Sequence, residues 1–261
     1  MFIHSIDPVI IELFGLEIRY YGLVYALGFL FMLYISQKLI TKDPIRNLDK
    51  QKLNDLYFWC MLSAIIGARI FHILFYNPLF YFQNPLEIIA LWHGGMSFHG
   101  GIVGAILAGY FFCRKHRISF LEAADIIILP FPIVLFFGRI ANFINAELVG
   151  PPTDLPWCVV FPGHEGCRHP TVLYEAIKNL FLFGLLFGVH LKKKKPGTIL
   201  WTFLLAYSIL RFFVQFLRPE TKYFLGLDSA QLLSLIFIPL AAYMLYRIRL
   251  PSTRIRGLRK T

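Results

Sequence analysis

The side chains of this 261-residue chain that could do chemistry are mostly cations and amides, placed inside or beside long apolar segments. An ionisable group inside an apolar segment is costly to bury, so its default interpretation is functional. Arginine dominates the set. Its planar guanidinium binds phosphate or carboxylate groups through paired hydrogen bonds and keeps its charge at low dielectric. The composition of the set therefore predicts recognition of an anion. Its members are Arg19, Arg69, Arg139, Arg168, Arg211, Arg218, Lys178 and Lys222.

The stretch "FFGRIANFINAEL" holds the densest group of polar side chains. In a helix, Arg139, Asn142 and Asn145 follow one another at i+3 along one side. Glu147 could hold or orient an arginine. Snorkelling of long side chains toward water accounts for Arg19 and Lys222, but it accounts poorly for an arginine among two amides and a carboxylate. We interpret this stretch as part of a binding site, and a purely structural polar patch is the alternative.

A second stretch, "GGMSFHGG", places a titratable ring between two glycine pairs at residues 94–101. Ser97 is a candidate helix cap, and a helix N-terminus attracts anions. His99 would lie in the first turn, where an unperturbed pKa of about 6.5 suits proton transfer near neutrality. A hydrogen-bonding structural histidine is the alternative. Gly100 and Gly104 lie four residues apart, a spacing that lets membrane helices approach closely.

The elements that carry these residues are long and apolar. The chain is 57% hydrophobic with a mean hydropathy of +0.61, and only 16% of its residues are charged, against about 25% in soluble domains. A membrane-spanning helix needs roughly 20 apolar residues. We therefore expect an all-α membrane protein, one polytopic domain over residues 1–261, without a cleavable signal peptide. The seven candidate spans are Tyr20–Leu39, Leu56–Phe75, Ser97–Phe112, Ala123–Phe137, Val172–Leu191, Ile199–Leu217 and Ala230–Tyr246.

The fourth of these segments is short and carries Pro130 and Pro132, which predicts a kink or a break. The net charge of +11 is concentrated on every second connection and on the C-terminal tail. The positive-inside rule places those segments in the cytoplasm, the N-terminus in the periplasm and the C-terminus inside, as seven spans require. The same rule explains the basic charge of the tail, so nucleic-acid binding is not needed to explain it. The region about 142–170, rich in Pro and Gly, is then a small periplasmic cap.

The polar residues of the different spans fall at one depth on this topology. Tyr20, Tyr21, Arg69, His99 and Arg211 all lie toward the external face. The same is true of Arg139 with its amides, Glu175 and Arg218. Chance would scatter them over both leaflets, so we predict a polar cavity that opens externally.

Two cysteines, Cys158 and Cys167, share the outer loop, where a disulfide and two free thiols are both open alternatives. The chain has no CxxC and no HExxH motif, and we predict no metal site.

Several motifs together resemble one family. The motifs "YGLVYALGF", "GGMSFHGG", "GRIANFINAELVG", "RHPTVLYE" and "LRFFVQFLRP" are similar, in this order, to those of the bacterial prolipoprotein diacylglyceryl transferases. The resemblance implies a seven-span inner-membrane enzyme with its site on the periplasmic side. The family moves the diacylglyceryl group of phosphatidylglycerol onto the thiol of the lipobox cysteine in a prolipoprotein signal peptide, releasing glycerol phosphate. No cofactor is implied.

The resemblance also implies site residues. Those expected to act in catalysis are His99, Arg139, Arg211 and Tyr21, and those expected to bind phosphatidylglycerol are Arg139, Asn142, Glu147 and Gly150. His99 is the candidate base, although it could merely position the lipid. One position departs from the family pattern, which often has Glu four residues after the arginine of the sixth span. This chain has Gln215 there, which leaves a direct carboxylate role at that position in doubt.

Two other classes compete with a transferase. An anionic-lipid transporter or flippase would also want arginines in a polar cavity, but it predicts inverted repeats and polar groups near the bilayer midplane. No such repeat is visible in the sequence. A non-catalytic scaffold does not require Arg, Asn, Glu and His at one depth.

Overall fold

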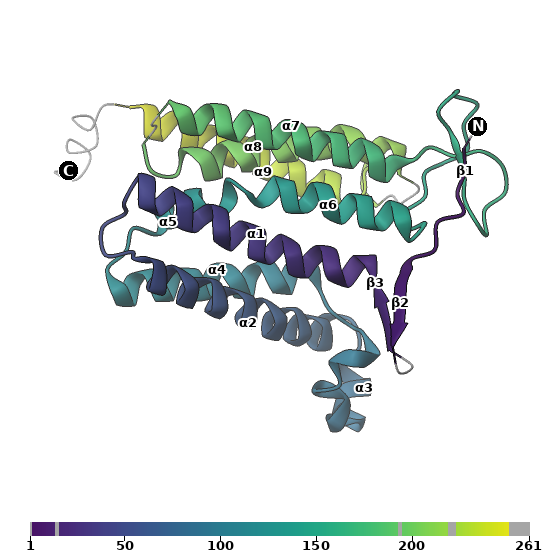
Figure 1. Cartoon of the computed structure of the whole chain (residues 1–261), viewed down its shortest axis with the longest axis horizontal. Helices are drawn as coiled ribbons and strands as arrows, with labels where there is room; N and C mark the ends of the chain where they lie inside the picture. The colour runs from purple at the N-terminus through teal and green to yellow at the C-terminus, as the bar shows by residue number, and fades with distance from the viewer. Residues whose placement is uncertain (1, 14–15, 193–194, 219–222, 251–261) are drawn as a thin grey trace. The chain divides into compact units, whose positions relative to one another are not determined.

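The computed structural model describes residues 2–13, 16–192, 195–218 and 223–250, and these are mostly helical (Figure 1). Lys193, Lys194, Lys222 and the basic residues after Leu250 lie outside the described residues. The helices are α1 (Tyr20–Lys42), α2 (Lys50–Phe75), α3 (Pro78–Gln83), α4 (Phe98–His116), α5 (Phe120–Ile128), α6 (Phe131–Ile144), α7 (Thr171–Leu191), α8 (Thr198–Val214) and α9 (Ser229–Arg249), with 3-10 turns η1 (Pro85–Ile88), η2 (Leu91–His93) and η3 (Gln215–Leu217).

Among the described residues, six segments are long and apolar enough to cross a membrane: α1, α2, α5 with α6, α7, α8 with η3, and α9. This confirms an all-α membrane protein. Helix α4 coincides with the predicted third span but is not one of the six. It contains four glycines and His99, and it ends on Arg114, Lys115 and His116, which lowers its hydropathy. The count of seven spans stays a prediction.

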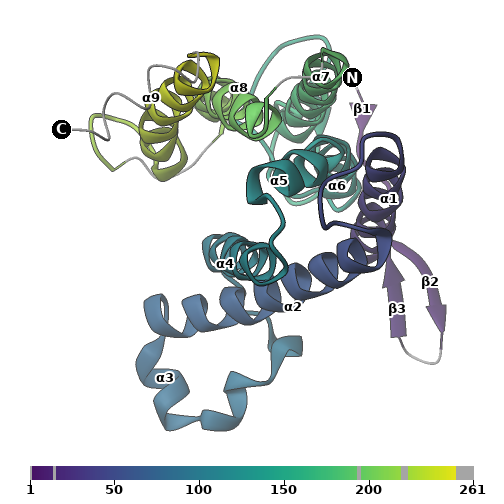
Figure 2. The same ribbon diagram turned by 90° about the vertical axis from the view of Figure 1, so that its left-hand side faces the viewer.

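The chain forms two compact units, residues 1–34 with 124–261 and residues 35–123. In the first unit α7 packs between α6 and α8, and α8 packs against α9 (Figure 2). In the second unit α2 packs along α4.

The predicted break in the fourth span is confirmed. Helix α5 ends at Ile128, and α6 begins at Phe131 with a proline in its first turn. Helix α5 contacts the start of α8, where it satisfies free backbone N–H groups. The Asp125 carboxylate accepts hydrogen bonds from the backbone N–H groups of Gly197 at 2.7 Å and Leu200 at 2.8 Å. Helix α6 is the segment that carries Arg139 and Asn142.

Short strands near the N-terminus are a part of the fold that was not predicted from the sequence. Strands β2 (Val9–Leu13) and β3 (Leu16–Arg19) form an antiparallel hairpin that leads directly into α1. Strand β1 (Phe2–Ile3) pairs in parallel with β4 (Val159–Val160) of the long loop. The His4 ring also makes a hydrogen bond of 2.7 Å with the backbone carbonyl of Phe143. The N-terminus is therefore tied to the loop that follows α6.

Glycines bring α2 and α4 into backbone contact, as their spacing predicts. A methyl group on Gly67 would lie 2.5 Å from the carbonyl oxygen of Gly100, and one on Gly104 would lie 2.1 Å from that of Ser63. Real side chains do not approach backbone atoms so closely, so the two helices meet at their glycines. This close packing holds the second unit together and fixes the start of α4.

Replacing Gly100 by Ala is expected to destabilise the protein by about 1–3 kcal/mol, the usual cost of overpacking. The new methyl group would lie 2.3 Å from both the Gly67 carbonyl oxygen and the Phe71 Cβ. The matched control is Gly101→Ala in the same helix, where the nearest atom would be 3.5 Å away. Because alanine is the better helix former, the control should unfold no earlier than the original protein. Thermal unfolding in detergent compares the two, and equal midpoints would contradict the close packing.

Candidate active site

The centre of the site is the Glu175 carboxylate, which lies near the start of α7 and is 2% exposed. Arg139 of α6 approaches it from one side, with its Nε 2.6 Å from Oε2. Arg211 of α8 donates from Nη1 to Oε1. Arg218, which follows η3, donates to the same oxygen at 3.3 Å. The Lys178 ammonium lies 4.0 Å from Oε2. We call these five residues the Glu175 cluster.

The Glu175 cluster has an excess of positive charge. Four basic side chains converge on one largely buried carboxylate, and Arg139 and Arg211 alone bring two fixed positive charges to it. The Lys178 ammonium lies 4.4 Å from the centre of the Tyr207 ring, which offers a cation its electron-rich face. The most accessible of the four cations is Arg139, at 22%. Because Arg139 and Arg211 share one carboxylate and buried charge is costly without a partner, the cluster is suited to receive an anion near Arg139.

A chain of amides extends this site along α6. Arg139 donates to the Asn142 side-chain oxygen at 3.2 Å, and the Asn142 amide donates to Glu147 at 2.7 Å. The Asn145 amide donates to the other Glu147 oxygen at 3.0 Å. The predicted grouping on one side of the helix is therefore present. Glu147 does not hold an arginine directly, because it reaches Arg139 only through Asn142.

Gly150 lies where the long loop returns to the start of α7. Its N–H donates to the His169 carbonyl at 3.1 Å, and a methyl group on Gly150 would lie 2.6 Å from that oxygen. Thr171 fastens the same place by donating from its hydroxyl to the Leu148 carbonyl at 2.8 Å. Gly150 therefore has a packing role, whatever it does for a ligand. In the same loop Cys158 and Cys167 form a disulfide, which settles the alternative left open by the sequence.

Tyr21 lies in the first turn of α1 and packs against Tyr25, with the rings tilted by 48° and their centres 4.8 Å apart. A methyl group on Gly138, the residue before Arg139, would lie 3.2 Å from the Tyr25 hydroxyl. The pair of tyrosines thus lies beside the segment of α6 that carries Arg139. Tyr25 is the nearer of the two, and it was not among the site residues predicted from the sequence.

His99 and Arg69 belong to the other compact unit, residues 35–123. His99 is exposed in the first turn of α4, beside the ring of Phe98, and its role stays a prediction. Ser97 occupies the N-cap position, but its side chain makes no capping hydrogen bond, so that expectation was wrong. Arg69 donates to five backbone carbonyls, those of Glu87, Ile88, Ala90, Gly94 and Gly95. Because its donors are used by the loop 87–95, Arg69 is a structural residue rather than an anion-binding one.

The partner of Arg211 is Glu175 and not a carboxylate four residues later. Gln215 is fully buried, and neither polar atom of its amide makes a hydrogen bond within the described residues. Glu175 was grouped by its sequence position with Arg139 and Arg211, but it was not among the predicted site residues. The signal was available, since a glutamate inside an apolar span needs a cationic partner.

The chemistry of the site follows from this charge. Guanidinium groups fixed in a place with little water stabilise negative charge that develops on a phosphate far better than water does. Among the described residues, no group of three or more His, Cys, Asp or Glu side chains could hold a metal ion.

Comparison with known proteins gives one consistent result. A family model described as "Prolipoprotein diacylglyceryl transferase" matches residues 8–247. A Bordetella avium protein is 44% identical over 85% of this chain and 84% of its own length. Proteins of Bordetella parapertussis and Nitrosomonas europaea are 42% and 40% identical over 87% and 94% of this chain, and 88% and 91% of their own lengths. All three are named phosphatidylglycerol–prolipoprotein diacylglyceryl transferase. With a family match over most of its length, the chain belongs to the prolipoprotein diacylglyceryl transferase family.

Proposed function

We propose that this chain transfers the diacylglyceryl group of phosphatidylglycerol to the thiol of the lipobox cysteine in a prolipoprotein signal peptide. The observation that carries the proposal is the convergence of Arg139 and Arg211 on the single Glu175 carboxylate, which leaves an excess of positive charge among these three side chains. A phosphodiester headgroup would supply the missing negative charge. The names of the relatives, with which the chain shares about 40% identity, support the same substrates.

The reaction exchanges one bond for another. The cysteine thiol, with an ordinary pKa of about 8.5, loses its proton to a base, and the thiolate attacks the lipid glycerol carbon that bears the phosphate. A carbon–sulfur bond forms, the carbon–oxygen bond breaks, and glycerol phosphate leaves with both electrons of that bond. The charge on the phosphate therefore changes from one negative to two. Arg139 and Arg211 stabilise the second charge as it develops, because they are held in place by Glu175 before the substrate binds.

The remaining site residues take supporting roles in this proposal. Asn142 and Glu147 extend the site from Arg139 and orient the headgroup through hydrogen bonds. Gly150 keeps the loop close to α7, and Tyr21 closes the site beside α6. His99 is the proposed base for the thiol proton. No cofactor takes part.

The location follows from the same reasoning. We propose a multi-pass protein of the bacterial inner membrane, one membrane domain whose site faces the periplasm, where prolipoproteins emerge. Its partners are phosphatidylglycerol, the signal peptide and the bilayer, and not nucleic acid. A carrier for anionic lipid is less well supported, because Glu175 lies near the start of α7 and not at the midplane.

A direct test measures turnover by the purified chain in vesicles that contain phosphatidylglycerol and a lipobox peptide. The peptide should gain the mass of a diacylglyceryl group on its cysteine, and glycerol phosphate should appear in equal amount. Vesicles of phosphatidylcholine, whose headgroup has no net charge, should support little transfer. Movement of phosphatidylglycerol between leaflets without any thioether product would favour the carrier instead.

Replacing His99 by Gln is expected to lower transfer about 10²–10³-fold, the range usual for removal of a general base. The loss should shrink as the pH approaches the pKa of the peptide thiol, because solvent then supplies the thiolate. The control is His93→Gln, an exposed histidine paired with Glu87 at 2.7 Å. A loss of the same size at every pH would mean that His99 positions the lipid and takes no proton.

A further inference from the structure

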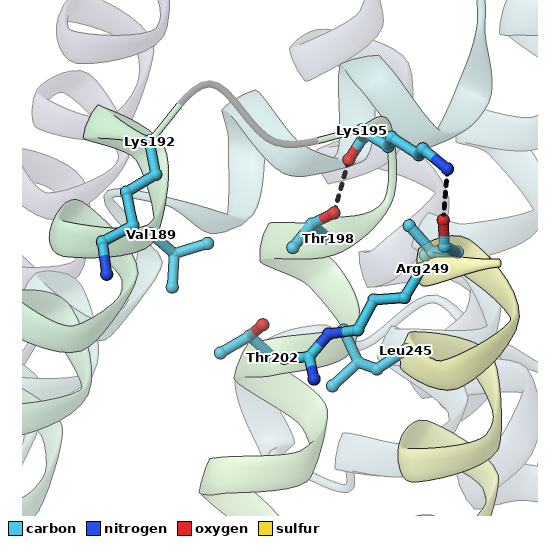
Figure 3. Close-up of a pocket in the computed structure, with 8 residues that line it drawn as sticks. Val189, Lys192, Lys195, Thr198, Thr202, Leu245 and Arg249 are labelled. Carbon is cyan, nitrogen blue, oxygen red and sulfur yellow. Dashed lines mark hydrogen bonds between the residues drawn. The ribbon is translucent and has the colours of Figure 1, made fainter. Parts of the chain in front are cut away.

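A cavity lies at the opposite end of the helices that carry the Glu175 cluster. Its volume is about 480 Å³, and residues at the last turn of α7, the first turns of α8 and the last turns of α9 line it (Figure 3). Glu175 and Val189 are fourteen residues apart on α7, about 20 Å along its axis. The cavity is therefore separate from the proposed active site. Its lining residues are Val189, Lys192, Lys195, Thr198, Thr202, Leu245, Ile248 and Arg249.

The cavity combines apolar walls with cations. Val189, Leu245 and Ile248 supply aliphatic surface. The Arg249 side chain extends from α9 toward Thr202 of α8, and Lys192 lies at the end of α7 (Figure 3). Among the described residues, neither cation makes an ion pair. The charge of this cavity is thus positive and uncompensated.

The neighbouring charged groups of Lys195 and Asp125 make hydrogen bonds to the backbone. Lys195 donates to the carbonyls of Ile248 at 2.8 Å and Leu250 at 3.2 Å, which ties the start of α8 to the end of α9. The Asp125 carboxylate, which reaches the same end of α8, is bonded to the N–H groups of Gly197 and Leu200. Among the described residues, Lys192 and Arg249 are consequently the two charged groups of the lining that remain available to a ligand.

We propose that this cavity binds an anionic phospholipid, with its phosphate between Lys192 and Arg249 and its acyl chains along the apolar wall. Basic pockets between the cytoplasmic ends of membrane helices bind acidic headgroups by this combination of charge and apolar surface. Free phosphate would find few hydrogen-bond donors here. The chain's own C-terminal segment, residues 251–261, carries four basic residues and no acidic side chain, so its charge is of the wrong sign.

The test uses the purified full chain in neutral detergent and a photoactivatable diacyl probe with a phosphatidylglycerol headgroup. Peptides that contain Thr202 or Leu245 should be labelled, and a phosphatidylcholine probe should label them weakly. In the double variant Lys192→Gln with Arg249→Gln, the half-saturating probe concentration should rise about 30-fold. The control, Lys42→Gln with Arg247→Gln, removes the same charge elsewhere and should leave that concentration unchanged. A second variant, Thr202→Phe, fills the cavity and should abolish labelling while every charge remains.

Three results would overturn the proposal. The first is equal half-saturation in the double variant and its control, and the second is equal labelling by the two probes. The third is removal of the label by millimolar inorganic phosphate, which would make the phosphate ion the ligand. Labelling at these peptides should persist in Arg139→Ala. That outcome separates this site from the proposed active site, so either proposal can fail without the other.

Discussion

Replacing Arg139 by Ala is expected to reduce transfer from phosphatidylglycerol to a lipobox peptide by about 10³–10⁵-fold. Arginines that neutralise developing charge on a phosphate contribute this much in phosphoryl-transfer enzymes. Arg139 is the most accessible cation of the Glu175 cluster and also anchors the amides of α6, so its loss removes both a charge and an orienting contact. The measurement is initial rate against phosphatidylglycerol concentration in vesicles.

The conservative variant Arg139→Lys separates charge from geometry. Lysine keeps the charge but cannot form paired hydrogen bonds, so most of the loss should remain. Arg19→Ala is the matched control, since Arg19 is exposed and pairs with Glu17 outside the cluster. Wild-type rates in Arg139→Ala would disprove the proposed role of the cluster.

Replacing Glu175 by Gln is expected to destabilise the protein by about 3–5 kcal/mol, because four cations would lose their shared counter-charge. The midpoint of thermal unfolding should fall by on the order of 10 °C. Transfer should fall as well, since Arg139 and Arg211 would no longer be held in place. Unfolding in detergent and turnover in vesicles measure the two effects separately.

Added phosphatidylglycerol and a second substitution distinguish the causes. If the excess of positive charge causes the loss of stability, phosphatidylglycerol should stabilise Glu175→Gln more than it stabilises the original protein. Gln215→Glu in the same background places a carboxylate at i+4 from Arg211 and should restore part of the stability. Activity should stay low, because Arg139 still lacks its partner. An unfolding midpoint that Glu175→Gln leaves unchanged would contradict the electrostatic account.

Much of the fold follows from local patterns. The apolar segments predict where the long helices lie, although α2 begins at Lys50 instead of Leu56 and α6 ends at Ile144 instead of Phe137. Pro130 with Pro132 predicts the break between α5 and α6. The spacing of Gly100 and Gly104 predicts close helix packing, because a small residue every fourth position lines one helix face. The N-terminal strands could not be predicted in this way. Strand β1 has two residues, and its partner β4 follows more than 150 residues later, so the pairing depends on tertiary structure.

The residue types of the site could be predicted from the sequence, but the partner that each side chain contacts could not. The predicted membrane depth indicates that Arg139 and Arg211 bind an anion, but it predicts the same for Arg69. What separates them is the surroundings: Arg69 faces the carbonyls of a loop, whereas Arg139 and Arg211 face one carboxylate. That distinction depends on which helices are neighbours, and the spacing along one helix does not contain it.

The bond between Cys158 and Cys167 has a use beyond holding the loop. Thiols pair where an oxidising machinery reaches them and stay reduced in bacterial cytosol. In a living cell the redox state of this pair therefore records which side of the bilayer the segment occupies. Alkylation of intact cells with an impermeant maleimide should leave both sulfurs unlabelled until a reductant is added outside, which turns the loop into a built-in reporter of orientation.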